Sequence, residues 1–108
     1  MYIISRKAFV EFGRSHPNAK RSLDRFYKLV CEVRWTSFDD VRKTFSNVDK
    51  VEEYLIFNIG GNDYRLIAKI SHYCYVKPNG EFNDAAFFVK KILTHAEYDR
   101  LVIPRDLR

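Results

Sequence analysis

The chain changes its hydrophobic period near Glu53, and this change constrains the fold more than any other feature. Beyond that point two β-rich runs, residues 54–59 and 64–73, are separated by the turn sequence Gly60-Gly61-Asn62-Asp63. Glycine and asparagine tolerate the positive φ angles that tight hairpin turns require. The sequence therefore predicts an antiparallel β-hairpin over residues 54–73.

The residues before the hairpin carry helical patterns. Residues 2–4 predict a short strand, and a helix that Ser5 could cap follows and ends at His16, because the residue before a proline avoids the helical region. A second helix, with Asn18 as its expected cap, has the clearest amphipathic pattern. Its apolar residues recur at i, i+3, i+4, i+7 and i+8: Leu23, Phe26, Tyr27, Val30 and Cys31. A short third helix is predicted after Ser37.

The last quarter of the chain predicts a strand that runs into a short helix. A polar loop at residues 77–84 leads to an apolar strand over residues 86–93. Thr94 and Glu97 then have the spacing of a capping box, which starts a terminal helix. The predicted fold is therefore α+β, with the N-terminal helices packed on one face of an antiparallel sheet and a short C-terminal helix. One domain is expected for 108 residues, and the second sheet face is expected to be open for a site.

The charge balance favours an anionic partner without proving one. Nineteen lysines and arginines against fourteen acids give a net charge of +5 and a pI near 9.3. Nucleic acid would suit this balance, but a basic charge can also serve solubility alone. The basic face of the second helix could likewise contact phosphate or simply be a solvated surface. The apolar runs are too short to span a bilayer, and the N-terminus lacks the pattern of a secretory signal. A soluble protein with no membrane contact is expected.

The cysteines and histidines argue against a metal site. Cys31 and Cys74 are 43 positions apart and form no disulfide framework. A zinc site built from these two cysteines with His16 and His72 would lack any of the usual ligand spacings. No metal and no cofactor are therefore expected.

Several polar residues near the sheet and the terminal helix are candidates for chemistry. His95 and Tyr98 are three residues apart and share a helix face, although a cap residue and a core tyrosine are the simpler readings. Alternation predicts that only one of Lys90 and Lys91 faces their cleft. Arg65 shares a strand face with Ile67 and Lys69, and a surface ion pair is its alternative role.

Two segments of the sequence resemble the HigB toxins of bacterial toxin–antitoxin modules. They are Ile59-Gly60-Gly61-Asn62-Asp63-Tyr64-Arg65-Leu66 and the run from Phe88 to Asp99, which contains Thr94-His95-Ala96-Glu97-Tyr98-Asp99. The resemblance implies a RelE-like fold and ribosome-dependent cleavage of messenger RNA in the cytoplasm. It also implies a HigA-type helix-turn-helix antitoxin. The protein would then contact operator DNA only as part of the complex with that antitoxin.

The resemblance also implies roles for individual residues. Arg65, Lys90, His95 and Tyr98 match the catalytic positions of the family, and Asn62, Lys69 and Lys91 are expected to bind RNA. Whether His95 acts as base or acid stays open, and Tyr98 could orient the 2'-hydroxyl, donate a proton or stack on a base. The segment from Val76 to Ala86 is longer than expected and could alter the rim of the cleft, and Lys91 stands where some members carry histidine. A non-cleaving translation inhibitor and an inactive member kept for operon repression are the alternatives.

Overall fold

The structure is a computed structural model that describes residues 1–103 and 105–107. Its helices are α1 (Arg6–Ser15), α2 (Pro17–Glu32), α3 (Phe38–Thr44), α4 (His95–Asp99) and the 3₁₀ helix η1 (Arg105–Leu107). Its strands are β1 (Tyr2–Ile4), β2 (Asp49–Val51), β3 (Tyr54–Ile59), β4 (Tyr64–His72), β5 (Tyr75–Val76), β6 (Phe82–Asn83) and β7 (Ala86–Thr94). The predicted order of elements is confirmed, and the sequence analysis missed β2, β5 and β6.

Five strands form one sheet in the order β1-β7-β4-β3-β2. Neighbouring strands from β2 to β7 pair antiparallel, whereas β1 runs parallel to β7. A parallel pair needs a long connection, and the three helices α1 to α3 and the strands β2 to β6, which lie between β1 and β7 in the chain, supply it. The predicted α+β fold is confirmed, and the parallel edge strand is its one departure from an all-antiparallel sheet.

The hairpin of β3 and β4 has the turn that its sequence predicts. Gly60 and Gly61 have φ angles of 62° and 69°, in the left-handed region where a side chain is strained. A Cβ atom on Gly60 would also come within 3.3 Å of the Tyr64 ring. The turn therefore depends on glycine at this position for both conformation and space.

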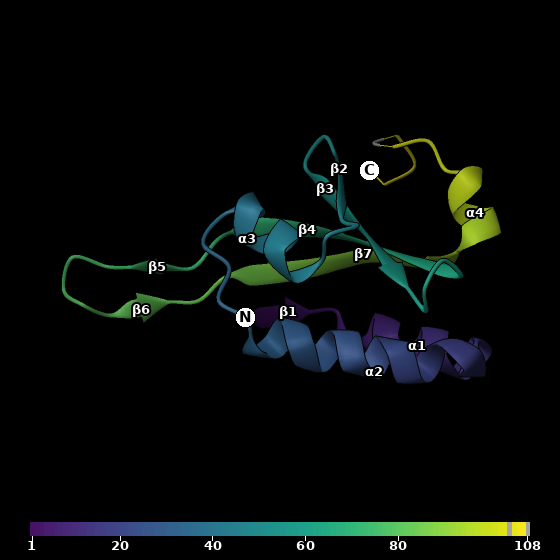
Figure 1. The fold of residues 1–108 in the computed structure, drawn as a ribbon, viewed down its shortest axis with the longest axis horizontal. Coiled ribbons are helices and arrows are strands. Elements are labelled where there is room, and N and C mark those ends of the chain that lie inside the picture. Colours follow the sequence, from purple (N-terminus) through teal and green to yellow (C-terminus); the bar gives the residue numbers. More distant parts are fainter. Residues whose placement is uncertain (104, 108) are drawn as a thin grey trace.

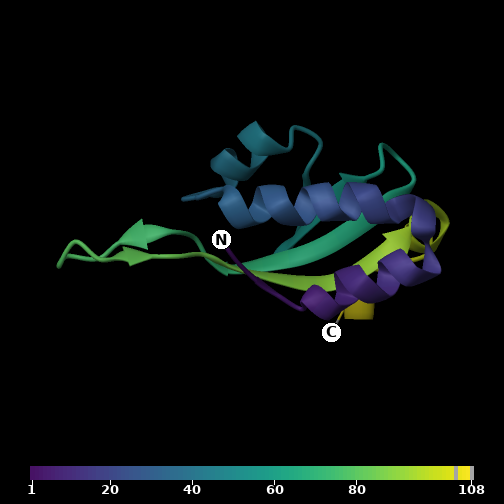
Figure 2. The same cartoon turned by 90° about the horizontal axis from the view of Figure 1, so that it is seen from below.

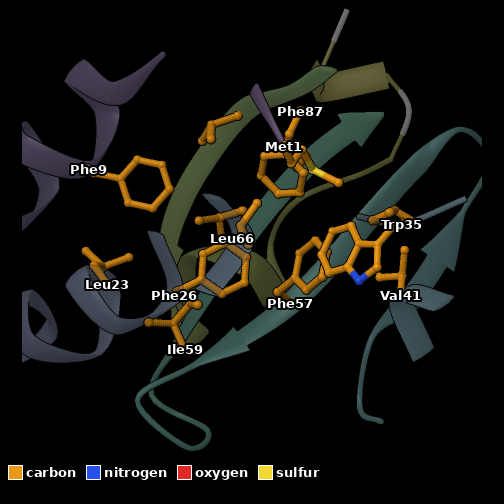
Figure 3. Packing of buried hydrophobic residues seen from close by; sticks show 14 of the residues in the cluster. Met1, Phe9, Leu23, Phe26, Trp35, Val41, Phe57, Ile59, Leu66 and Phe87 are labelled. Carbon is orange, nitrogen blue, oxygen red and sulfur yellow. The ribbon is translucent and has the colours of Figure 1, made fainter. Parts of the chain in front are cut away.

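Helices α1 and α2 lie side by side on one face of the sheet (Figure 1, Figure 2). The main core fills the space between them and the strands (Figure 3). At its centre the Phe26 ring of α2 lies 5.1 Å from the Phe57 ring of β3 and 6.1 Å from the Phe87 ring of β7. No helix in the described part of the chain is both long enough and apolar enough to cross a membrane.

Helices α1 and α2 lie where the sequence predicts them, but their predicted capping residues do not cap them. Helix α2 begins at Pro17, with His16 as N-cap, rather than after Asn18, because proline suits the first helical position. Ser5 precedes α1 in a left-handed conformation and makes no capping hydrogen bond through its side chain. Cys31, placed on the apolar face of α2 by its spacing, is exposed. These three predictions, the caps at Asn18 and Ser5 and the buried Cys31, were wrong.

The second face of the sheet is partly covered, which corrects the expectation of an open face. Tyr54, Ile56 and Ile67 form a second buried cluster there. The segment after β7 packs on it through four side chains, Tyr98, Leu101, Ile103 and Leu107, beside Leu93 of β7 itself. Any site on this face therefore lies beside a small apolar core and not on a bare sheet.

The segment after β4 forms a separate two-stranded arm of β5 and β6. It projects from the end of the sheet opposite α4 (Figure 1). The β4–β7 register agrees, since His72 pairs with Ala86 at the arm end and Tyr64 pairs with Thr94 at the α4 end. The expectation that this longer segment alters the rim of an Arg65 cleft is therefore wrong.

Candidate active site

Arg65 is held at the start of β4 by the turn that precedes it. The residue is 8% exposed. Its Nη1 donates to the carbonyl oxygens of Asn62 and Tyr64, at 3.1 and 3.0 Å, and its Nη2 donates to Oδ1 of Asn62 at 2.7 Å. These bonds use three of the five N–H groups of a guanidinium and fix its orientation. The alternative of an ion pair is not observed for Arg65 within the described residues.

Tyr98 of α4 lies against this guanidinium. The Arg65 Cζ atom is 5.7 Å from the centre of the Tyr98 ring, within the range of a cation–π contact. Burial raises the pKa of Tyr98, the charge of Asp49 raises it further, and the charge of Arg65 opposes both. The phenol is therefore protonated at neutral pH and able to donate a hydrogen bond beside a fixed positive charge.

His95 opens α4 at the same end of the sheet. Its backbone N–H donates to the Asp63 carbonyl oxygen at 3.0 Å, which ties the helix to the hairpin turn. Its Nδ1 is buried and lies 3.3 Å from Oδ2 of Asp99, without hydrogen-bond geometry, while the side chain as a whole is 43% exposed. The turn residues Asn62 and Asp63 therefore hold Arg65 and His95 respectively, although no hydrogen bond joins these two side chains in the part of the molecule described.

The capping box that starts α4 is confirmed. The Glu97 N–H donates to Oγ1 of Thr94 at 3.2 Å, and the Thr94 N–H donates to Oε1 of Glu97 at 3.0 Å. The second of these bonds, from the Thr94 backbone, is the main cause of the lowered pKa of Glu97. A carboxylate whose pKa is lowered by folding stabilises the fold above its ordinary pKa and loses that contribution as pH falls through the lowered value.

Replacing Thr94 with alanine is expected to reduce the free energy of unfolding by about 1 kcal/mol, because the hydroxyl acceptor of the cap is lost. Chemical denaturation at neutral pH measures this difference. For Glu97→Gln, the loss relative to the parent is expected to be present at neutral pH and to fade once the pH falls below the lowered Glu97 pKa. A loss that is the same at neutral and acid pH would show that the carboxylate charge contributes nothing to the cap.

Lys90 and Lys91 both lie on the second sheet face, which corrects the prediction from alternation. Ile67 pairs with Lys91 and Ala68 pairs with Val89, so Lys90 is an extra, unpaired residue at a β-bulge. Lys91 shares the face of Ile67, and it adds to the lowering of the Asp106 pKa, whose main cause is a hydrogen bond from the Val102 N–H. The bulge inserts one residue, so strict alternation fails here.

The two lysines occupy different surroundings on that face. Arg65 pairs with Leu93, which makes Lys91 its diagonal neighbour, roughly 7–8 Å away across the two strands. Lys90 lies nearer Glu53, whose pKa is lowered first by a hydrogen bond from Lys69 and further by the charge of Lys90. Lys91 is thus better placed than Lys90 to share a ligand with Arg65.

Lys69 is paired and not free on its strand. Its Nζ lies 3.1 Å from Oε2 of Glu53, and both side chains are partly exposed. Such a pair is worth little to stability, and an anionic ligand could compete for the lysine. Lys69, Glu53 and Lys90 form a second charged group on the same face, toward the arm end of the sheet.

The structure also reveals neighbours of Arg65 that the sequence analysis missed. Asn58 is its direct partner on β3, and Asp49 of β2 lies close enough to Tyr98 to raise its pKa. Asp49 was missed because β2 was not predicted, and without that strand nothing brings it to this face. We call Arg65, Tyr98, Asp49 and Lys91 the Arg65 cluster.

Within residues 1–103 and 105–107, no group of three or more histidine, cysteine, aspartate or glutamate side chains is arranged to hold a metal ion. Apart from the Asp49 carboxylate, the Arg65 cluster consists of two nitrogen cations, Arg65 and Lys91, and the Tyr98 phenol. These groups bind and polarise an oxyanion such as a phosphate diester.

Comparison with protein families identifies the group to which this arrangement belongs. The model for HigB toxin, the RelE-like toxic component of a toxin–antitoxin system, matches residues 19–101. The chain belongs to the HigB toxin family. The match covers every candidate site residue of this HigB-family chain, and β1 and α1 lie outside it. The resemblance found in the sequence is confirmed, and a toxin of this kind implies an antitoxin partner.

Individual HigB proteins support the same assignment. The chain is 34% identical over 104 residues to the mRNA interferase HigB of Escherichia coli O6:H1 strain CFT073, covering 94% of this chain and 91% of the relative. It is 22% identical over 102 residues to the mRNA interferase toxin HigB of Escherichia coli K12, covering 92% and 88%. The similarity to HigB proteins therefore extends over nearly the whole of each chain.

Proposed function

We propose that this chain, acting as one toxin domain, cuts messenger RNA as an endoribonuclease. Its similarity to proteins named mRNA interferases supports the substrate and the reaction. The observation that carries the proposal is the guanidinium of Arg65, fixed by three hydrogen bonds and lying against Tyr98. Preorganised cations of this kind stabilise charge that develops in a transition state.

RNA carries its own nucleophile, so the proposed reaction needs no metal ion. The 2'-oxygen attacks the adjacent phosphorus and loses its proton to a base, and the bond from phosphorus to the 5'-oxygen breaks. An acid gives the departing 5'-oxygen a proton. The products are a 2',3'-cyclic phosphate and a 5'-hydroxyl, and the protein contributes alignment, charge stabilisation and proton transfer.

Each candidate residue has a role in this proposal. Arg65 stabilises the charge on the phosphorus oxygens, with Lys91 as the nearer second cation and Lys90 beyond it. His95 transfers a proton, through the part of its ring that lies away from the buried Nδ1. Tyr98 donates a hydrogen bond to the 2'-oxygen or to a phosphate oxygen.

Two further residues act on binding and orientation. Asn62 orients Arg65 through its Oδ1 and carbonyl oxygen, in addition to the RNA contact expected for it from the sequence. Lys69 contacts the RNA backbone when an RNA phosphate displaces the Glu53 carboxylate from the Lys69 ammonium group.

The setting of the reaction is part of the proposal. We infer that the substrate is messenger RNA engaged by the ribosome in the cytoplasm. A HigA-type helix-turn-helix antitoxin would neutralise the toxin, and the toxin would reach operator DNA only within their complex. The family supports an antitoxin partner, and the other points extend from it.

Mapping of RNA ends after brief expression tests this function. New 5' ends are expected inside translated reading frames, with 5'-hydroxyl groups and matching 2',3'-cyclic phosphates. The same transcript with a disabled ribosome-binding site is expected to stay whole. Cleavage of both transcripts would contradict the ribosome requirement, and 5'-phosphate ends would contradict attack by the 2'-hydroxyl.

The alternative of a non-cleaving inhibitor gives a different result in the same experiment. The low exposure of Arg65 and its bonds to the turn would also suit a purely structural arginine. In that case translation would stop while the transcripts remained intact. Both the nuclease and the non-cleaving inhibitor are expected to arrest growth when expressed without the antitoxin, whereas an inactive member is not.

A further inference from the structure

Most of the excess positive charge of the chain lies on the helical pair that faces away from the Arg65 cluster. Residues 6–32, which contain α1 and α2, carry seven lysines and arginines against three acids. Their net charge of +4 compares with +5 for the whole chain. The proposed nuclease chemistry uses none of these residues, so their charge needs a separate account.

A groove of about 680 Å³ runs between these two helices. Its lining includes four cations, and Asp24 is the single acid. The cations are Arg6 and Arg14 of α1 and Lys20 and Lys28 of α2. None of the four forms an ion pair with another residue in the described chain. The groove therefore presents unneutralised positive charge along both of its sides.

The cations have a regular spacing. Arg6 and Arg14 are eight residues apart on one helix, and so are Lys20 and Lys28 on the other. Eight residues of α-helix span about 12 Å, a little over two turns. Because α2 runs back along α1, positive charge stands at both ends of the groove, with Asp24 midway along α2.

The floor of the groove is apolar between these charged ends. Val10 is 47% exposed, and Phe9 and Tyr27 line the groove beside it. Gly13 of α1 lies against the Lys20 side chain, where a Cβ atom would make ordinary contact at 3.6 Å. A glycine inside a helix costs about 1 kcal/mol relative to alanine, and here it leaves the floor of the groove open.

The aromatic rings of the groove are poorly suited to stack on RNA bases. The Phe9 residue is 7% exposed, and its ring packs edge-to-face against Tyr27 with centroids 5.2 Å apart. The Arg6 guanidinium carbon lies over the Tyr27 ring, 5.4 Å from its centre. Single-stranded nucleic acids bind such grooves by stacking on open ring faces. A partner with apolar side chains fits this floor better than a row of bases does.

We propose that the groove between α1 and α2 is the docking site for an acidic amphipathic helix of a partner protein. Helix-in-groove recognition reads apolar anchors at helical spacing. Here the partner would place carboxylates seven or eight residues apart, one at each end of the groove, with large apolar residues between them over Val10. Asp24 excludes an acid at the centre of the partner helix. This inference goes beyond the proposed nuclease activity and does not rest on it.

The test measures binding of a designed helical peptide to the purified full chain. The peptide has glutamates at i and i+8 and leucines at i+3 and i+4, and a matched peptide has lysines in place of the glutamates. Fluorescence anisotropy is expected to detect binding of the acidic peptide alone. The double variant Arg14→Glu with Lys20→Glu is expected to weaken that binding by about tenfold or more, since like charges then face each other.

A control with the same change in net charge separates the groove from general attraction. Lys7→Glu with Arg21→Glu reverses two exposed charges on the same helices outside the groove lining. The affinity is expected to change by less than about threefold, because charges that do not contact the peptide act on it only through screened, longer-range attraction. If the groove variant loses helicity by circular dichroism, Val10→Asp replaces it and is expected to weaken binding similarly. Equal affinities for the groove and control variants would overturn the proposal. The proposal would also be overturned if the parent chain bound oligouridylate but not the peptide, and the groove variant no longer bound oligouridylate.

Discussion

Replacing Arg65 with lysine is expected to lower cleavage of translated messenger RNA by about 10²–10³-fold, the loss typical when one preorganised donor at a developing negative charge is removed. Lysine keeps the charge but has no planar fork, so it cannot accept the orientation that Asn62 and Tyr64 impose while still presenting donors to a phosphate. The measurement is the rate of appearance of 5' ends in a reconstituted translation reaction with saturating ribosomes.

Asn62→Ala provides a graded comparison for this prediction. It leaves Arg65 in place and removes one of the three acceptors of its guanidinium, so a loss of about tenfold is expected. Thermal unfolding of both variants checks that the hairpin is intact. If Arg65→Lys is folded and cuts at the rate of the parent, the guanidinium only braces the turn and the proposed mechanism is wrong.

Replacing His95 with glutamine is expected to slow cleavage by about 10²–10⁴-fold, the range for loss of a group that transfers a proton in the transition state. Glutamine keeps a polar side chain of similar size at the first position of α4, and the backbone bond to Asp63 does not involve the side chain. The rate should therefore change much more than the binding of the transcript, which filter binding with ribosome complexes measures.

Asp99→Asn is the matched control for His95. Asp99 lies 3.3 Å from Nδ1 but its side chain is 62% exposed, and exposed charge pairs contribute little. The expected change in rate for Asp99→Asn is less than about threefold. Undiminished cutting by a folded His95→Gln protein would remove His95 from the chemistry and leave Tyr98 as the remaining candidate for proton transfer.

The features that sequence predicts well in this chain are those decided by local chemistry. The glycine turn, the amphipathic pattern of α2 and the capping box at Thr94 each depend on residues close together in sequence. Each is present, although Cys31 lies outside the buried face of α2. Pro17 shows the limit of such reasoning, because the same proline that ends α1 also begins α2.

The features that sequence missed depend on residues far apart. Strand β2 has three residues with no strong apolar signal, and it forms because β3 offers it an edge. The polar loop predicted at residues 77–84 contains β6, and no strand was predicted for β5, since each of these strands has only two residues. The cover of the second sheet face requires the C-terminal segment to fold back over it, which no local pattern indicates.

The same distinction applies to the candidate site. The family resemblance and the periodicity selected Arg65 and Tyr98, and the structure brings these two into contact. Neither indicated that Asn62 accepts hydrogen bonds from the guanidinium or that the charge of Asp49 raises the pKa of Tyr98. Whether these residues act on RNA stays a prediction that the variants above address.

The bulge at Lys90 makes the length of β7 adjustable at one position. Removing Lys90 would restore regular pairing from Phe87 to Thr94, because Val89 and Lys91 would then meet consecutive residues of β4. Removing Ile92 would instead move Leu93 to the face that lies toward the helices and carry α4 out of register with the hairpin. Deletion of Lys90 alone is thus expected to remove one positive charge from this surface while the pairing of β7 and the packing of the interior are preserved.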